Sequence, residues 1–84
     1  MTSAGVDELE EVVAASWRDA LGLESLPPDA NLFAIGGDSM VAVVIAADLG
    51  QRLGVEVGLA DLLDHPTLSA FTDRLRDVVA AGSG

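Results

Sequence analysis

Ser39 is the residue of this sequence best suited to covalent chemistry. It follows Gly36, Gly37 and Asp38 and begins a long apolar segment. The chain offers few other reactive groups, since it has a single histidine, His65, and neither cysteine nor lysine. A serine at the start of a helix can be a helix cap, a nucleophile or an attachment point for a covalent group.

The spacing around Ser39 argues against a hydrolase. The nucleophile elbow of many hydrolases reads Gly-x-Ser-x-Gly, whereas Met40 and Val41 follow this serine. His65 stands beside Pro66 at an expected helix break, and one serine with one histidine makes no catalytic triad. A single histidine among scattered carboxylates also makes no metal site. We therefore expect a protein that is not an enzyme and that binds no metal.

The composition favours packed helices and disfavours several kinds of partner. Half of the 84 residues are hydrophobic but only 4 % are aromatic, and the net charge is −10. Such a polyanion repels nucleic acid and anionic membrane surfaces. The uncharged segment 39–47 is far shorter than the roughly 20 residues of a membrane span, and the acidic N-terminus is no signal peptide. We expect a cytoplasmic monomer.

Hydrophobic periodicity predicts an all-α bundle of three main helices and one short helix. The expected helices are Val6–Leu21, a second beginning at a cap on Asp38 or Ser39 and ending near Leu53, a short turn at Ala60–Asp64, and about 12 residues after Thr67. A long loop containing Pro27 and Pro28 joins the first two. We expect one domain over residues 1–84, with an ordered core at about 6–80 and a frayed Ala-Ala-Gly-Ser-Gly end. The start at Met1 favours a free-standing protein.

The second helix carries apolar residues on two faces when its positions are placed at the helical step of about 100°. One face is expected in the core and holds Ala42, Ala46, Leu49 and Leu53, with Val43 and Ile45 at its edges. Another apolar group lies among the polar residues of the helix and consists of Met40, Val41, Val44 and Ala47. Exposed apolar surface of this kind marks a docking site, unless neighbouring elements cover it.

Three motifs make the sequence resemble the phosphopantetheine-dependent carrier proteins. Residues Leu32–Met40 are similar to the attachment motif Phe-x-x-Gly-Gly-Asp/His-Ser-Leu of that family. Leu62–Leu68 contains its His-Pro-Thr signature, and Trp17 with Leu21-Gly22 matches its Trp-x-x-x-Leu-Gly pattern. The motifs occur in the family's order and cover nearly the whole chain. The resemblance implies the four-helix fold of acyl carrier proteins.

The resemblance also implies a function for Ser39. A transferase would esterify it with 4′-phosphopantetheine from coenzyme A, while Gly36 and Gly37 leave room for that enzyme and Asp38 caps the helix or orients the serine. The arm would hold an aminoacyl, peptidyl or acyl group as a thioester. Partners would be an adenylation enzyme, condensation or tailoring enzymes and a thioesterase.

The branch of the family is indicated by a few positions. Fatty-acid carriers usually have acidic residues where this chain has Val41 and Val44, whereas Gly36-Gly37 and Trp17 resemble carriers of nonribosomal peptide synthetases. We therefore predict a peptidyl carrier, with a polyketide-type acyl carrier as the alternative. An alternative of another class is an acidic helical adaptor in which Ser39 is only a cap.

Overall fold

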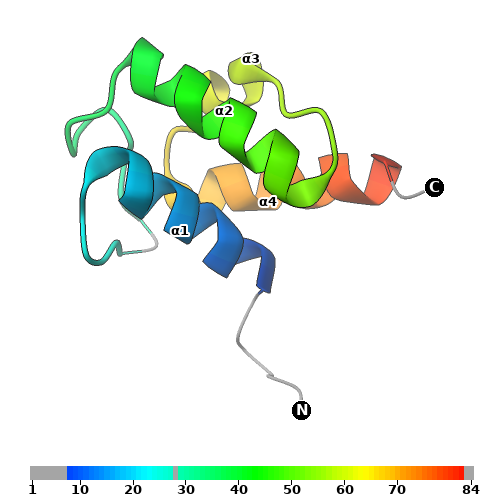
Figure 1. The fold of residues 1–84 in the computed structure, drawn as a ribbon, viewed down its shortest axis with the longest axis horizontal. Helices are drawn as coiled ribbons and strands as arrows, with labels where there is room; N and C mark the ends of the chain where they lie inside the picture. Colours follow the sequence, from blue (N-terminus) through cyan, green and yellow to red (C-terminus); the bar gives the residue numbers. More distant parts are fainter. Residues whose placement is uncertain (1–7, 28, 83–84) are drawn as a thin grey trace.

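The computed structural model describes residues 8–27 and 29–82, which form a bundle of four helices (Figure 1). In chain order these are α1 (Glu8–Leu21), α2 (Ser39–Leu53), α3 (Leu59–Asp64) and α4 (Leu68–Gly82). The predicted all-α fold with a long loop between the first two helices is confirmed. None of the described helices has both the length and the apolar character needed to cross a membrane.

The observed helix ends differ from the expected ones at both ends of the chain. Val6, the expected start of the first helix, lies outside the described residues. The last helix runs to Gly82 and is 15 residues long, so it is longer than the expected length of about 12 residues. The expected fraying of the Ala-Ala-Gly-Ser-Gly end stays a prediction, and the last two of these residues lie outside the described part of the chain. Ala80 and Ala81 extend the helix because alanine has the highest intrinsic helix propensity.

The core lies where α1, α2 and α4 meet, and α3 packs on α2 and α4 (Figure 1). Its largest fully buried side chains include Trp17 of α1, Ile45 of α2 and Phe71 of α4. The rings of Trp17 and Phe71 are stacked with centroids 6.2 Å apart. Burial of such side chains contributes about 1.5–3 kcal/mol each, which this chain needs because it has no disulfide.

A polar group joins α1 to α2 beside this core. Ser16, which is buried, donates a hydrogen bond of 2.7 Å from Oγ to Oδ2 of Asp48. Arg52 bridges Asp48 and Asp19, with nitrogen–oxygen distances of 2.9 and 3.1 Å. The Ser16 hydrogen bond, aided by Arg52, lowers the pKa of Asp48 below the ordinary aspartate value. The side of α2 that carries Asp48 therefore faces α1.

The long loop before α2 is anchored to the segment that precedes α4. Asn31 and Thr67 form an isolated antiparallel bridge. Next to it, the backbone nitrogen of Leu32 donates to the carbonyl oxygen of Pro66 over 2.8 Å. The side chain of Leu32 is completely buried in the core. The loop thus enters the attachment motif from a fixed point on the His-Pro-Thr segment.

Candidate functional site

Ser39 is the first residue of α2 and its side chain is exposed. The N-cap is Asp38, whose backbone is extended and whose Oδ1 accepts a 3.0 Å hydrogen bond from the nitrogen of Val41. The carbonyl oxygen of Asp38 accepts from the nitrogen of Ala42 over 2.9 Å, which begins the helical ladder. Of the two capping residues that the sequence allows, the structure selects Asp38. The hydroxyl of Ser39 therefore does not serve as the helix cap.

The structure explains in different ways why each of the two residues before Asp38 is a glycine. Gly36 has φ 109°, a conformation that favours glycine because a side chain there is strained. Gly37 lies so close to Leu32 that an added Cβ would be 2.7 Å from its carbonyl oxygen and 2.8 Å from its Cγ. The sequence suggests that both glycines leave room for a partner enzyme. The structure shows in addition that the backbone conformation at Gly36 and the contact between Gly37 and Leu32 disfavour a side chain at either position.

The exposed apolar residues of α2 differ in part from the expected set. Met40 and Val44 are 74 % and 54 % exposed, and Ala47 is exposed as predicted. Val41 is half-buried and packs against the core, so its placement on the exposed face is wrong. The reason is α1, which covers the side of α2 that carries Asp48, and Val41 is only about 20° from Asp48 around the helix.

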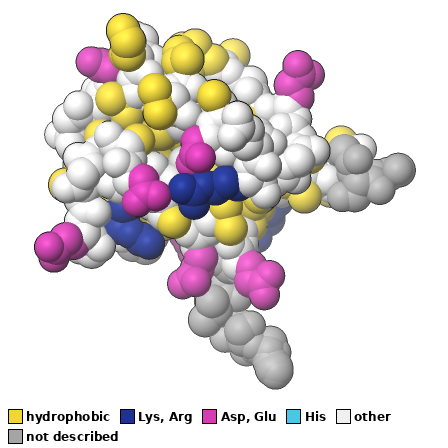
Figure 2. All heavy atoms as spheres, in the orientation of Figure 1, with side chains coloured by type: hydrophobic (Ala, Val, Ile, Leu, Met, Phe, Trp, Pro, Cys, Tyr) yellow, Lys and Arg dark blue, Asp and Glu magenta, His cyan; other side chains and the backbone are white. Residues whose placement is uncertain are grey.

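Val43 replaces Val41 on the exposed face. It was expected at the edge of the core but is 50 % exposed. The α2 apolar surface therefore consists of Met40, Val43, Val44 and Ala47. It begins one residue after Ser39, and Figure 2 shows hydrophobic side chains gathered over α2 on the face presented there. An apolar surface next to a reactive side chain is suited to protein contact.

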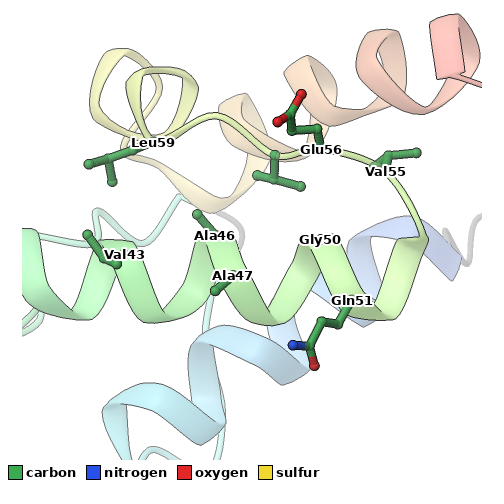
Figure 3. Close-up of a pocket in the computed structure, with 9 residues that line it drawn as sticks. Val43, Ala46, Ala47, Gly50, Gln51, Val55, Glu56 and Leu59 are labelled. Carbon is green, nitrogen blue, oxygen red and sulfur yellow. The ribbon is translucent and has the colours of Figure 1, made fainter.

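A groove of about 490 Å³ borders one side of this surface (Figure 3). Val43, Ala46 and Gly50 form its wall on α2, and Val55 and Leu59 line the opposite side. At Gly50 the two walls come together, because a Cβ there would lie 3.1 Å from the carbonyl oxygen of Val55. This close approach accounts for a glycine in the last turn of α2, where it lowers helix propensity.

The arrangement defines a class of protein: a small helical bundle that presents a serine at the start of its second helix. The family described as "Phosphopantetheine attachment site" matches residues 11–75 of this chain. The chain belongs to this family. It is a carrier protein whose cofactor is covalent 4′-phosphopantetheine, as the resemblance implied.

Individual relatives point to the same branch of the family. The chain is 39 % identical over 77 residues, 89 % of its length, to the nonribosomal peptide synthetase opaA of Aspergillus ustus. It spans only 2 % of that synthetase. The expected resemblance to carriers of nonribosomal peptide synthesis is thereby confirmed.

Two solved structures contain chains of similar length with the same fold. BlmI, a type-II acyl carrier protein from Streptomyces verticillus involved in bleomycin biosynthesis, superposes with a TM-score of 0.80 at 30 % identity. That match covers 83 % of this chain and 84 % of BlmI. A peptidyl carrier protein in complex with the phosphopantetheine transferase Sfp and coenzyme A has a TM-score of 0.80 at 28 % identity. The second match covers 90 % of this chain and 99 % of that one.

One residue next to the motif was missed by the sequence interpretation. Asn31 accepts hydrogen bonds from backbone nitrogens of the turn that leads to Gly36. An asparagine that begins a turn is a known signal for such bonds, so its position before the attachment motif could have indicated this role.

Proposed function

We propose that Ser39 carries the 4′-phosphopantetheine arm and that the protein holds an aminoacyl or peptidyl intermediate on it as a thioester. The observation that carries this proposal is the separation of roles at the start of α2. Asp38 caps the helix, while the adjacent Ser39 keeps an exposed hydroxyl. The side chain that best fits the cofactor is thus not needed to hold the fold.

The residues around Ser39 fit a phosphodiester. The N-terminal end of a helix favours a phosphate group through its dipole and its first backbone N–H groups. Gly36 and Gly37 put no side chain beside the hydroxyl. The chain has no cysteine, so the thiol of a thioester has to come from the arm. When bound, the arm supplies that thiol at the end of a flexible tether.

The proposed attachment is a transfer to the Ser39 hydroxyl. Its Oγ forms a bond to the phosphorus that carries the pantetheine group of coenzyme A, and the pyrophosphate bond of coenzyme A breaks. Adenosine bisphosphate leaves, and the serine proton passes to the solvent or to a base of the transferase. The carrier contributes the oxygen and its position, and the transferase contributes the catalysis.

The partners proposed are those of a peptidyl carrier. They are a phosphopantetheinyl transferase, an adenylation enzyme, condensation or other tailoring enzymes, and a thioesterase. The structural likeness to a carrier bound by such a transferase supports the first of them. We propose that Met40, Val44 and Ala47, joined by Val43, form the docking surface, with Val41 supporting it from the core side.

In this proposal the protein catalyses no step itself. A tethered thioester reaches each partner at a high effective concentration, and this tethering is the carrier's contribution. The carrier acts as a monomer in the cytoplasm, where coenzyme A is available as the donor of the arm. The identity of the amino acid is set by the pocket of the adenylation enzyme.

The proposal is tested by intact-mass spectrometry of the full chain after incubation with coenzyme A and a promiscuous phosphopantetheinyl transferase. We expect a gain of one phosphopantetheine in the natural sequence and none in Ser39→Ala. Ser69→Ala is a matched control, since Ser69 is exposed on α4, and it should be modified like the natural sequence. A gain that survives Ser39→Ala, or no gain at all, would overturn the assignment.

A further inference from the structure

The side chain of Asn31 holds together the turn that precedes Ser39. Its Oδ1 accepts hydrogen bonds from the backbone nitrogens of Phe33 and Ala34, at 2.9 and 3.2 Å. Its carbonyl oxygen accepts from the nitrogens of Ala34 and Ile35, at 3.0 and 3.1 Å. Three successive N–H groups thus bond to one residue, as they do at a helix cap or an Asx turn.

The base of this turn is rigid. Asn31 forms the antiparallel bridge with Thr67, and the neighbouring Leu32 is bonded to Pro66 through its backbone. Leu32 is also fully buried, so its position is fixed by the core. Asn31 is therefore held in place by its bridge to Thr67 and by its neighbour Leu32, and it can position residues 33–36.

The tip of the turn has little else to hold it. Phe33 is 40 % exposed, and Ala34 and Gly36 are exposed as well. Their packing therefore stabilises the tip only weakly. The remaining bond, from the nitrogen of Gly37 to the carbonyl oxygen of Leu32 at 2.8 Å, closes the turn after its tip. The conformation of residues 33–36 thus depends on Asn31, whose carboxamide adds two hydrogen bonds to those that its backbone carbonyl accepts.

We propose that Asn31 is a positioning residue for the attachment of 4′-phosphopantetheine to Ser39. It fixes residues 33–36 as the part of the surface that a transferase meets on its way to the hydroxyl. This inference rests on the proposed function of Ser39. Asn31 acts through the turn and touches none of the reacting atoms, while the Asp38 cap keeps Ser39 in place on α2.

This division of roles predicts a particular kinetic change. Loss of the Asn31 carboxamide loosens the surface that the transferase recognises, so the KM of the enzyme for the carrier rises. The kcat stays unchanged because the hydroxyl is presented by an intact α2. We expect the KM to rise about five- to tenfold in Asn31→Ala, as for one or two lost hydrogen bonds.

The experiment measures initial rates of modification of the full chain by intact mass, with coenzyme A and one promiscuous transferase, over a range of carrier concentrations. Asn31→Asp is the rescue variant, because a carboxylate oxygen accepts the same two N–H groups. Its KM should remain within about twofold of the natural sequence. If Asn31→Ala does not fold, Asn31→Gln replaces it, since its amide oxygen is displaced by one methylene.

A stability-matched control separates positioning from general loss of stability. Thr72→Ala removes the buried hydrogen bond from Thr72 Oγ1 to the carbonyl oxygen of Leu68, 2.7 Å long, on α4. This variant should melt at a lower temperature but keep the natural KM. Amide hydrogen exchange gives an independent measure: exchange at Phe33, whose nitrogen bonds to the carboxamide oxygen, should be faster in Asn31→Ala and unchanged in Thr72→Ala.

Two results would overturn the role of Asn31. One is a folded Asn31→Ala or Asn31→Gln protein with the natural KM, and the other is an Asn31→Asp protein as impaired as Asn31→Ala. Either result leaves the function of Ser39 intact as long as Ser39→Ala stays unmodified. Modification of Ser39→Ala would instead remove the proposed function, whatever the Asn31 variants do.

Discussion

Gly37 lies against the backbone of Leu32 so closely that a Cβ on residue 37 would be 2.7 Å from the carbonyl oxygen of Leu32. The same oxygen accepts the hydrogen bond from the nitrogen of Gly37 at 2.8 Å. Leu32 is buried and its nitrogen is bonded to Pro66, so it cannot move away easily. Gly37→Ala should therefore lower the free energy of unfolding by about 1–3 kcal/mol, measured by urea titration.

A second glycine provides the control for Gly37. At Gly58 a Cβ would meet only a side-chain oxygen of Asp61 at 3.4 Å, and its φ of −82° suits alanine. Gly58→Ala should lower the free energy of unfolding by clearly less than Gly37→Ala does, within about 1 kcal/mol, because residue 58 is an N-cap position. Equal losses in the two variants would show that the contact with Leu32 does not restrict residue 37.

The division of roles between Asp38 and Ser39 predicts different effects on stability. Asp38→Ala removes the oxygen that accepts the hydrogen bond from the nitrogen of Val41, and it should lower the free energy of unfolding by about 1 kcal/mol. Ser39→Ala should leave the melting temperature almost unchanged, because its exposed side chain does not cap α2. Thermal unfolding followed by circular dichroism measures both. A loss in Ser39→Ala equal to that in Asp38→Ala would support a capping role for the serine.

The order and kind of the helices follow from the sequence because their signals are local. The α2 helix starts after Asp38 and ends before Gly54, whose left-handed conformation caps it, as the capping residues predict. The last helix extends further than predicted, since it includes Ala80, Ala81 and Gly82. Helix boundaries are less certain than helix existence because fraying depends on small differences in free energy.

The parts of the site that were not predicted depend on contacts between distant segments. A helical wheel gives the positions of Val41 and Val43 around α2 but does not show which side of the helix α1 covers. The sequence therefore predicts Val41 as exposed and Val43 at the edge of the core, whereas in the structure Val41 packs against the core and Val43 is exposed. The need for glycine at position 37 comes from Leu32, which is held by the segment before α4. Such contacts arise only when residues far apart in sequence are brought together.

The lowered pKa of Asp48 predicts a pH dependence of stability. The Ser16 hydrogen bond, followed by the hydrogen bond and charge of Arg52, outweighs the opposing effect of partial burial. A carboxyl whose pKa is lower in the folded state stabilises the fold above its unfolded pKa of about 4. This contribution is lost as the pH falls through the lower, folded-state value.

Asp48→Asn should therefore have a lower melting temperature than the natural sequence at pH 7. The difference between the two melting temperatures should shrink below about pH 4. Melting temperatures measured from pH 7 to pH 3 test this. Asp73→Asn is a control, because its ion pair with Arg76, at 3.4 Å, is solvent-exposed and such pairs contribute about 0–1 kcal/mol. A constant difference between Asp48→Asn and the natural sequence at all pH values would contradict the assigned role of Asp48.

Substitutions at Val44 and Val41 should separate docking from packing on α2. Val44 is 54 % exposed, so Val44→Gln should change stability by less than about 0.5 kcal/mol. It should still weaken aminoacyl loading by the adenylation enzyme, because it removes part of the α2 apolar surface next to Ser39. Val41→Gln instead places a polar group where the side chain packs against the core, and should cost about 1–3 kcal/mol.

Glutamine is used in both variants because it adds no charge beside Asp48, which follows Val44 by one helical turn. Loading is measured as the rate of thioester formation on the modified carrier, and stability by urea titration. Because the two valines are three residues apart on one helix, a difference between them reports which side of α2 faces a partner. If Val44→Gln unfolds the protein as Val41→Gln does, Val44 belongs to the core. If Val44→Gln is stable and loads at the natural rate, the adenylation enzyme binds elsewhere on the carrier.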